Sequence, residues 1–330
     1  MIVWQGHPDT WPKPEGPTSV TIGVFDGVHL GHRSLLSHLD RSFTATVLTF
    51  EPHPVEVLAP GTHPRLLTSI EERIELFGAL GIEQVGVIDL ADIRYLEPES
   101  FVTGILVEKL HAAQVVVGED YRFGRDRAGD AGLLHKLGEQ HGYETVAAPL
   151  MHSAGGVVSS TRIRNLIAEG RPEDASACLA SLFRITGEVI EGDKRGRELG
   201  FPTANLAPPP RKVLPADGVY AGFAVVDGER LPAAINVGVR PTFGEGHRLI
   251  EAYILDFEGD LYGRTIAVEF AHWLRPEKRF DTVGDLLVQM RDDVDRTRVL
   301  SGSAVWVPEG GSIPPIPPLD EKQPRDESHI

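Results

Sequence analysis

The chain has 330 residues, of which 41% are hydrophobic and 24% charged, proportions typical of a globular protein with one large domain or two ordinary ones. Its 48 acidic and 32 basic residues give a net charge of −16, which argues against a nucleic-acid backbone as the main ligand. Small anionic substrates remain compatible with this charge, because a few Arg or Lys side chains can override the overall sign locally.

The single cysteine, Cys178, excludes an intrachain disulfide and is typical of a cytoplasmic protein. The first 19 residues contain Trp4, Trp11 and several prolines, but no basic region leading into an apolar core, so we expect no signal peptide. No apolar run approaches the roughly 20 residues that a membrane-spanning helix needs.

The first functional candidate is the stretch Gly23–His32. It follows an apolar, β-branched run, Ser19–Val24, and precedes leucines at helical spacing (Leu35, Leu36 and Leu39), a pattern that predicts a strand, a tight turn and a helix. Three glycines leave little side-chain bulk in the turn, so backbone N–H groups and the start of the helix can approach an anion.

Two imidazoles, His29 and His32, lie at the same turn. Neutral or protonated, they can donate hydrogen bonds to phosphate oxygens, and they carry positive charge when protonated. Two other interpretations remain: a purely structural glycine turn, and a metal site, for which the sequence offers no third His or Cys nearby.

The stretch Gly23–His32 resembles the nucleotidyltransferase signature of the bifunctional riboflavin kinase/FMN adenylyltransferases, the bacterial FAD synthetases. The resemblance implies a Rossmann-like nucleotidyltransferase domain whose ATP ligands here are Gly23, Phe25, Asp26, His29, Gly31 and His32.

A second predicted strand, Ala45–Phe50, ends in Glu51-Pro52-His53-Pro54. The two prolines predict a stiff, extended loop, which is either a rigid turn or a ligand loop at a strand end. The resemblance favours the ligand loop and implies that Pro54 contacts FMN.

Further helices and strands alternate along this half. Ser69 and Glu72 form a capping-box pattern at the start of a helix that Gly81 ends, and Gln84–Ile88 follows as a strand. An amphipathic helix, Phe101–Leu110, then precedes the strand Gln114–Val117. Strands that alternate with helices predict a parallel sheet covered by helices.

The loop that follows Val117 combines glycines, aromatic residues and three arginines. Such a loop can stack on a planar ligand and hold a phosphate, or it can be a solvated loop with ordinary salt bridges. It resembles the flavin mononucleotide loop of the same family, which implies FMN contacts from Asp120, Phe123 and Arg125; some members have Asn in place of Asp120.

A strand at Glu144–Ala147 precedes the last motif of this half, Ser159–Arg164. Hydroxyls at a helix start are usually caps, but two arginines in the first turn oppose the helix dipole, which favours an anion between them. The motif resembles the second phosphate motif of the family, so Ser160, Thr161 and Arg164 are expected to hold the triphosphate.

Beyond a helical connector, short β-rich runs dominate, with one later helix at Val283–Leu300. The runs are Arg184–Ile190, Gly218–Val226, Pro232–Val237, Leu249–Phe257 and Thr265–Phe270. This pattern predicts a small barrel or sandwich. We expect domains at 1–183 and 184–300 and a disordered, proline-rich tail at 301–330.

The basic, glycine-interrupted loop Gly192–Leu206 suits phosphate and magnesium binding, although a surface hairpin can carry similar charges. Its Pro-Thr-Ala-Asn tetrapeptide, Pro202–Asn205, resembles the riboflavin-kinase signature, and the stretch Asn236–Phe243 strengthens that match. The resemblance implies a six-stranded antiparallel β-barrel kinase domain that binds Mg2+ through Thr203 and Asn205 and ATP through Gly192, Lys194, Gly196, Gly200, Thr203 and Asn205.

The residues alone favour Glu251 as a structural partner of an Arg or Lys on its predicted strand. The resemblance instead makes it the general base that takes the proton from the ribityl hydroxyl of riboflavin. Riboflavin contacts are then expected from Glu251, Arg279, Phe280 and Arg291.

Taken together, the motifs predict a bifunctional, cytoplasmic transferase that phosphorylates riboflavin to FMN with ATP and adenylylates FMN to FAD. Glu251, His29, His32 and Arg164 are its expected catalytic residues. Its expected partners are small molecules, without nucleic acid or membrane, and its expected state is a monomer or weak homo-oligomer. The alternatives are that one activity alone is retained, or that the chain is a flavin-binding regulatory protein.

Overall fold

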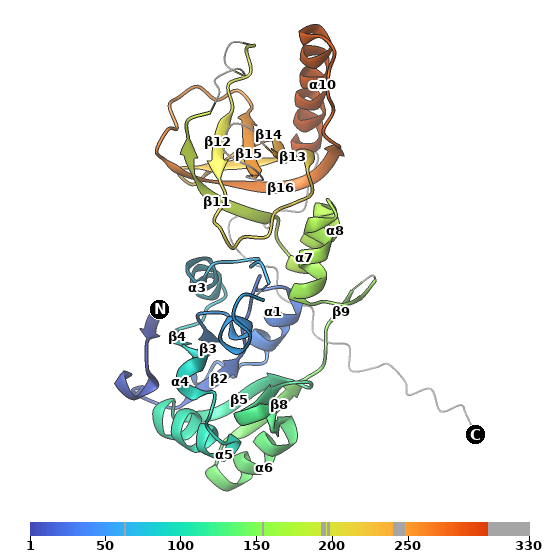
Figure 1. Ribbon diagram of the computed structural model, residues 1–330. Coiled ribbons are helices and arrows are strands. Elements are labelled where there is room, and N and C mark those ends of the chain that lie inside the picture. Colours follow the sequence, from blue (N-terminus) through green and yellow to red (C-terminus); the bar gives the residue numbers. More distant parts are fainter. Residues whose placement is uncertain (63, 154, 193–195, 197–198, 240–247, 303–330) are drawn as a thin grey trace, which may run out of the picture.

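A computed structural model describes residues 1–302 except 63, 154, 193–195, 197–198 and 240–247. It has an α/β half and a β-barrel half, with helices α7 (Ser160–Ala168) and α8 (Pro172–Leu179) between them (Figure 1). This arrangement confirms the predicted fold class. The expected tail at 301–330 falls almost entirely outside the described residues. Lys194 and the second half of the stretch Asn236–Phe243, residues 240–243, also lie outside them.

The α/β half is built on a six-stranded sheet in which all pairings are parallel. The spatial order of the strands is β1-β4-β3-β2-β5-β8. Their bounds are β1 Ile2–Gln5, β2 Thr18–Ile22, β3 Thr44–Phe50, β4 Gln84–Ile88, β5 Ala112–Gly118 and β8 Glu144–Ala148. The edge strand β1 was not predicted.

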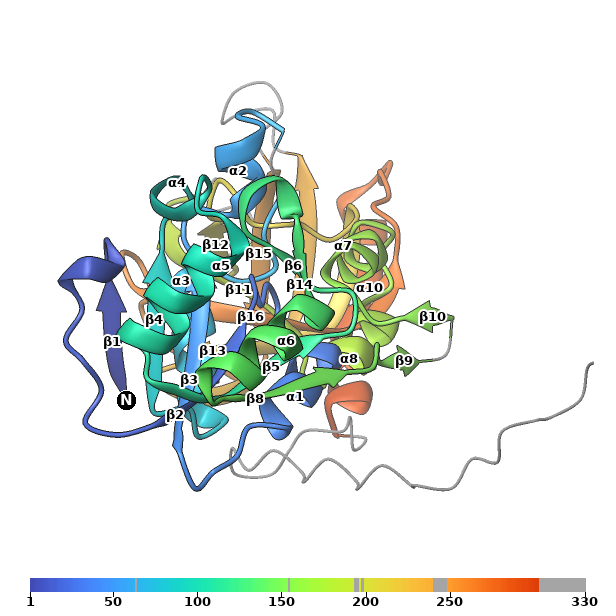
Figure 2. The same cartoon turned by 90° about the horizontal axis from the view of Figure 1, so that it is seen from below.

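Alternate residues of the sheet enter two separate cores, as the period of two along a strand requires. In β5, Val116 packs with helices α1 and α3, whereas Val115 and Val117 pack with helices on the opposite face. Figure 2 shows these helices around the sheet. The helical segments are α1 Leu30–Ser37, α2 Pro54–Leu58, α3 Ile70–Ala79, α4 Leu90–Ile93, α5 Pro98–Phe101 and α6 Ala131–His141.

One predicted helix differs in type. The segment expected as an amphipathic α-helix, Phe101–Leu110, is α-helical only to Phe101 and is π-helical from Val102 to Lys109. Short 3-10 turns at Pro8–Thr10 and Arg125–Arg127 and two small ribbons complete this half. The ribbons pair β6 (Arg122–Phe123) with β7 (Gly129–Asp130), and β9 (His152–Ser153) with β10 (Gly156–Val157).

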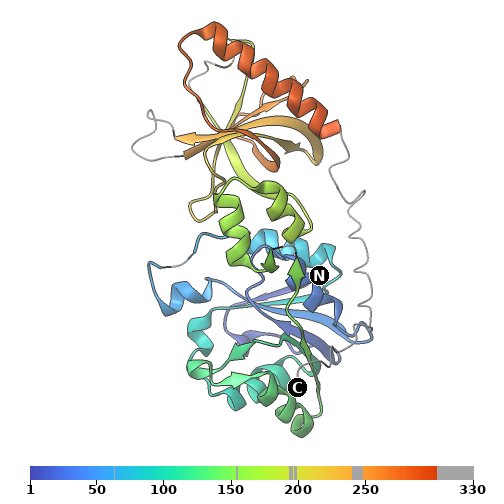
Figure 3. The same ribbon diagram turned by 90° about the vertical axis from the view of Figure 1, so that its right-hand side faces the viewer.

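The second half is a closed antiparallel barrel in the order β11-β12-β15-β14-β13-β16. Helix α10 (Val283–Gly302) lies against its outer surface at β13 and β14, as Figure 3 shows. The strands are β11 Phe183–Ile190, β12 Ala204–Ala207, β13 Gly218–Val226, β14 Glu229–Val239, β15 Arg248–Ile254 and β16 Thr265–Arg275. Of the six strands, β12 was not predicted as one.

No helix in the described part of the chain is long and apolar enough to cross a membrane. The one cysteine, Cys178, is buried in the core formed by α7, α8 and the barrel.

Candidate active sites

The strand order brings the predicted ligand loops of the first half together. Strands β3, β2 and β5 are neighbours in the sheet, and the loops after them are those with His53, His29 and Asp120. The carboxyl ends of parallel strands lie at one edge. The sequential order of the strands reverses between β2 and β5, since β3 and β4 follow on one side and β8 on the other, and ligands of open α/β sheets bind at such a point.

His29 and His32 form the centre of this edge. His29 caps the N-terminus of α1, with its Nδ1 accepting from the backbone N–H of His32 at 3.4 Å, and the two rings stack with centroids 3.6 Å apart. Burial lowers the pKa of His29 to about 4 and that of His32 well below its usual value. Both rings are therefore neutral near pH 7, so the positive charge considered from the sequence is absent in the free protein.

The buried Nδ1 of His32 has no hydrogen-bond partner within the described part of the chain. A buried polar atom without a partner costs free energy, and this cost is removed when a ligand supplies the missing hydrogen bond. Its position beside the stacked ring of His29 is consistent with a phosphate-oxygen contact.

Two glycines of this turn lie in close packing. A Cβ on Gly31 would lie 3.2 Å from the His29 ring, and a Cβ on Gly27, whose φ is +86°, would lie 2.8 Å from Leu67. Phe25 is fully buried and packs edge-on against Phe77, so its side chain belongs to the core. Any contact of Phe25 with ATP must therefore come from its backbone.

Asp26 is a buried hub. Its carboxylate is 1% exposed and accepts from the backbone N–H groups of Leu67 and Thr68 at 2.9 Å each. Its other oxygen pairs with Arg164 Nη2 at 2.7 Å. The backbone carbonyl of Asp26 accepts from the Ser160 hydroxyl at 2.9 Å, so helix α7 is tied to the turn at two points. Both carboxylate oxygens of Asp26 are thus bound to protein groups. The role of this side chain is therefore to orient Arg164 rather than to contact a ligand directly.

The two arginines of the Ser159–Arg164 motif separate. Arg162 donates to Ser153 Oγ and to the carbonyl of Gly156, both at 2.9 Å, and so fixes the β9–β10 ribbon. Arg164 instead turns to Asp26. These different partners do not support an anion held between the two guanidinium groups, and they leave Arg164 as the arginine directed at the Gly23–His32 turn. Thr161 is exposed.

The residues that were predicted to contact FMN differ in their exposure. Pro54 begins α2 and is half-buried, and Asp120 is exposed after β5. Arg125 is exposed and pairs with Glu97 at 3.0 Å. Phe123 lies in the core, where a Cβ on Gly129 would be 2.6 Å from its ring, so it presents no open face for flavin stacking.

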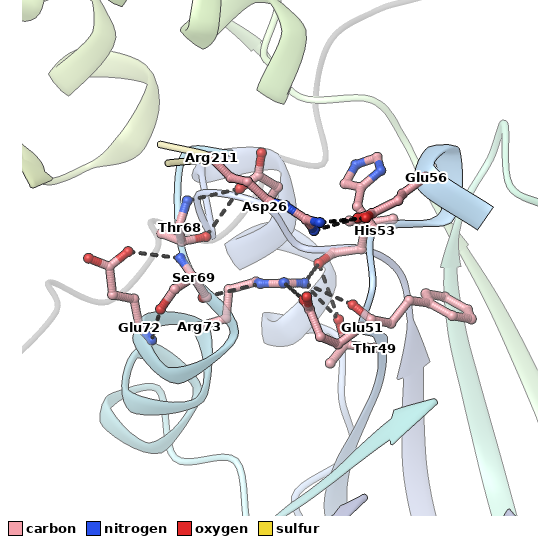
Figure 4. A network of polar contacts seen from close by, with 12 residues as sticks. Asp26, Thr49, Glu51, His53, Glu56, Thr68, Ser69, Glu72, Arg73 and Arg211 are labelled. Atoms are coloured by element: carbon pink, nitrogen blue, oxygen red, sulfur yellow. Dashed lines mark hydrogen bonds and ion pairs between the residues drawn. The ribbon is translucent and has the colours of Figure 1, made fainter. Parts of the chain in front are cut away.

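Arg73 was missed from the sequence. Its side chain is fully buried and donates to the carbonyls of Val24 at 2.8 Å and Phe50 at 3.3 Å, and it pairs with Glu51 at 2.9 Å (Figure 4). It thereby joins the loops after β2 and β3. The only sequence signal was a charged residue at the start of a helix, which usually indicates a solvated position.

A second cluster of polar residues lies on the outer surface of the barrel. Strand register places Glu251 opposite Asn205 on one side and Asn236 on the other. Directly opposed residues of antiparallel strands share a face, and the neighbours Ile250 and Ala252 fill the barrel interior, so these three polar residues face outward. Asn236 Nδ2 donates to Glu251 Oε2 at 3.3 Å and lies 3.5 Å from Glu277.

Close packing surrounds Asn205. Its Nδ2 donates to the Thr203 carbonyl at 3.4 Å, and a Cβ on Gly192 would lie 2.4 Å from it. A Cβ on Gly196 would lie 2.4 Å from the Phe201 carbonyl. Gly192 therefore allows the loop to approach Asn205, and Gly196 allows the loop to pack against its own backbone. Gly200 has a φ of +84°, which favours glycine.

The remaining residues that were predicted to contact riboflavin lie in helix α10 or shortly before it. Arg279 and Arg291 are exposed, and Phe280 is half-buried with Lys278 Nζ 5.5 Å from its ring centroid. In the part of the chain that the structure describes, no three His, Cys, Asp or Glu side chains are grouped to hold a metal. The hydroxyl of Thr203 and the amide of Asn205 nevertheless offer the oxygen ligands that a hard cation prefers.

Comparisons with known proteins agree for both halves. Residues 12–162 match the FAD synthetase family model, and residues 179–301 match the riboflavin kinase model. The bifunctional riboflavin kinase/FMN adenylyltransferase of Escherichia coli strain K12 is 37% identical over 288 residues, covering 85% of this chain and 91% of that protein. The enzyme of the same description from Pseudomonas fluorescens is 38% identical over 85% and 92%.

A solved structure from Streptococcus pneumoniae, described as a macrolide-efflux protein, superposes with a TM-score of 0.82 at 29% identity and covers 90% of this chain and 99% of its own. It shares the two-part fold. Because both family models match and the bifunctional relatives are covered almost completely, the chain belongs to the bifunctional riboflavin kinase/FMN adenylyltransferase family.

Proposed function

We propose that the chain converts riboflavin and ATP to FMN and ADP in its barrel half, and FMN and ATP to FAD and pyrophosphate in its α/β half. The observation that carries the proposal is the 37% identity with a bifunctional enzyme along 91% of that enzyme's length. We divide the chain into an adenylyltransferase domain at 1–183, a kinase domain at 184–300 and a tail at 301–330.

In the kinase step, the terminal ribityl hydroxyl attacks the γ-phosphorus of ATP and the bond to ADP breaks. Glu251 takes the proton of that hydroxyl as general base. Asn236 donates to the Glu251 carboxylate and keeps it oriented toward the outer surface. Arg279, Phe280 and Arg291 border the flavin, and Gly192, Lys194, Gly196 and Gly200 form the nucleotide loop.

Thr203 and Asn205 supply oxygen ligands for Mg2+, which offsets the negative charge of the transferring phosphoryl group when it is bound. Magnesium commonly takes one or two protein oxygens and completes its shell with water and substrate phosphates, so an all-protein cage is not required.

In the adenylyl step, an FMN phosphate oxygen attacks the α-phosphorus of ATP and pyrophosphate leaves, so no covalent enzyme intermediate is needed. His29 and His32 donate hydrogen bonds to phosphate oxygens as neutral imidazoles, and Arg164, with Ser160 and Thr161, holds the triphosphate. These donors act by position and by stabilising the developing charge. Asp120, Arg125 and Pro54 lie on the FMN side.

We further propose that the enzyme is cytoplasmic and acts as a monomer or weak homo-oligomer; the single cysteine, Cys178, is compatible with a reducing compartment. Retention of one activity alone is the second candidate, and the first test below separates it from the proposal.

The test incubates the protein with riboflavin, ATP and Mg2+ and separates the flavins over time. We expect FMN and then FAD. His32→Ala should abolish FAD formation and leave FMN formation intact, and Glu251→Ala should abolish FMN formation but not FAD formation from added FMN. Exposed matched controls are His135→Ala and Glu258→Ala. Absence of both products would end the enzymatic interpretation, and FMN without FAD would favour a single activity.

A further inference from the structure

The segment between β12 and β13 of the barrel half docks on the α/β half. The backbone N–H of Leu66 donates to the carbonyl of Arg211 at 2.6 Å, and that of Val213 donates to the carbonyl of Leu66 at 2.9 Å. Leu66 and Lys212 thus form a parallel bridge between segments almost 150 positions apart. Arg211 adds a bidentate pair with Glu56, both distances being 2.5 Å.

Lys212 is the buried part of this contact. It is 4% exposed, and its ammonium group lies 2.6 Å from Glu72 Oε2 and 5.6 Å from the Phe183 ring centroid. Burial lowers the pKa of Lys212, and the adjacent Glu72 acts in the opposite direction. A charged side chain this deeply buried is held by its partner, so the pair fixes the geometry between the two halves.

Glu72 has a second task in the α/β half. Its Oε2 accepts from the backbone N–H of Ser69 at 2.9 Å, while the Ser69 hydroxyl accepts from the backbone N–H of Glu72 at 3.2 Å. This capping box fixes the start of α3 (Figure 4). One carboxylate oxygen therefore accepts from both the helix cap and the lysine of the other half.

Between Leu66 and Ser69 lie the two residues that hold the hub of the adenylyltransferase site. The backbone N–H groups of Leu67 and Thr68 bind the Asp26 carboxylate, and the Thr68 hydroxyl accepts from the backbone N–H of Gly27 at 2.8 Å. The barrel half thus contacts this short segment at both ends: at Leu66 through the backbone, and at Ser69 through Lys212 and Glu72.

We propose that Lys212, although it lies in the kinase half, is a positioning residue for adenylyl transfer. It acts through Glu72 and the 66–69 segment on Asp26, and through Asp26 on Arg164. The inference rests on the proposed function. Within the residues that the structure describes, the side chain of Lys212 contacts Glu72 and Phe183 and none that we assign to the kinase site, so its replacement should leave riboflavin phosphorylation unchanged.

The experiment uses the full chain and measures FMN formation from riboflavin and, separately, FAD formation from added FMN, each with kcat and KM for ATP. Lys212→Met keeps an unbranched side chain, one atom shorter, and removes its charge. We expect kcat for FAD formation to fall about tenfold or more, as a misplaced catalytic group does, with riboflavin phosphorylation within about twofold of wild type. Lys212→Arg should restore FAD formation to within about threefold of wild type. Lys136→Met, on the exposed face of α6, is the matched control.

A double variant separates positioning from stability. Lys212→Met leaves Glu72 without its counter-ion, whereas Lys212→Met with Glu72→Gln removes that charge and keeps a residue that can complete the capping box. The double variant should regain Tm but not the rate of FAD formation. If it regained both, if Lys212→Met left FAD formation within twofold, or if both reactions fell together, the proposal would be overturned. Absence of FAD formation in the wild type would refute the proposed function itself.

Discussion

Replacing Asp26 by Asn tests the hub of the adenylyltransferase site with a minimal change of shape. One carboxylate oxygen accepts from Leu67 and Thr68, and the other faces Arg164 Nη2 at 2.7 Å. In Asp26→Asn the amide oxygen can keep the two backbone donors. The amide NH2 group then faces the guanidinium, so two donors meet and the charge of Arg164 loses its partner.

The magnitude follows from burial. The side chain of Asp26 is 1% exposed and that of Arg164 is 14% exposed. Breaking such a buried pair by removing one partner costs about 3–5 kcal/mol. For a unit of about 150–250 residues, each kcal/mol lowers Tm by roughly 2–4 °C, so we expect the first unfolding transition to fall by about 6–20 °C. FAD formation should fall at least about tenfold because Arg164 is no longer oriented.

The assay combines differential scanning calorimetry with the two flavin reactions at a temperature below the lowered transition. Asp92→Asn, an exposed position on α4, serves as the control for the chemical change. Riboflavin phosphorylation by Asp26→Asn should stay near the wild-type rate. If Tm and FAD formation were both unchanged, the Asp26 carboxylate would not be holding Arg164 in place. If both reactions fell equally in a folded variant, Asp26 would not act on adenylyl transfer alone.

Three further predictions concern single residues. Gly31→Ala should slow FAD formation and spare FMN formation, because the new Cβ lies 3.2 Å from the His29 ring; equal rates would contradict this packing argument. Glu251→Gln should lower kcat for riboflavin phosphorylation by about a hundredfold or more without lowering FAD formation from added FMN, as separate flavin assays can establish. Burial lowers the pKa of His29 from 6.5 to about 4, so between these pH values its side chain is protonated in the unfolded chain and neutral in the folded one. The contribution of His29 should therefore lower the free energy of unfolding on acidification, by about 2 kcal/mol between pH 7.5 and 5. Urea titrations of His29→Gln should lack this part of the slope, and an unchanged slope would contradict the assignment.

Short-range features were predictable because both partners of each interaction lie in one sequence window. The capping box of Ser69 and Glu72 was expected and is present, and so is the strand, turn and helix around His29. The alternation of strands and helices was enough to predict the parallel sheet, whereas the short β-rich runs left a barrel or a sandwich open and the family resemblance selected the barrel.

Features set by distant neighbours were not predictable in this way. Arg73 and Glu72 are adjacent charged residues on one helix, yet Arg73 turns inward to carbonyls of two loops and Glu72 reaches a lysine 140 positions away. Helical periodicity gives the face of a residue but not the polar groups that another part of the chain places opposite it. The family resemblance assigned Phe123 to the FMN site, but a resemblance in sequence does not show that its ring packs against Gly129 in the core.

The electrostatics of the proposed adenylyltransferase site favour a role in positioning over one in attracting charge. His29 and His32 are neutral because they are buried, and the charge of Arg164 is offset by Asp26 at 2.7 Å. Before ATP binds, the groups at this turn therefore carry little net positive charge. Donors that are already fixed need no reorganisation when charge develops on the phosphates, and this lowers the barrier even where the initial attraction is weak. The buried Asp26–Arg164 pair reduces long-range attraction for ATP, and in exchange it holds the guanidinium in one place beside the histidine stack.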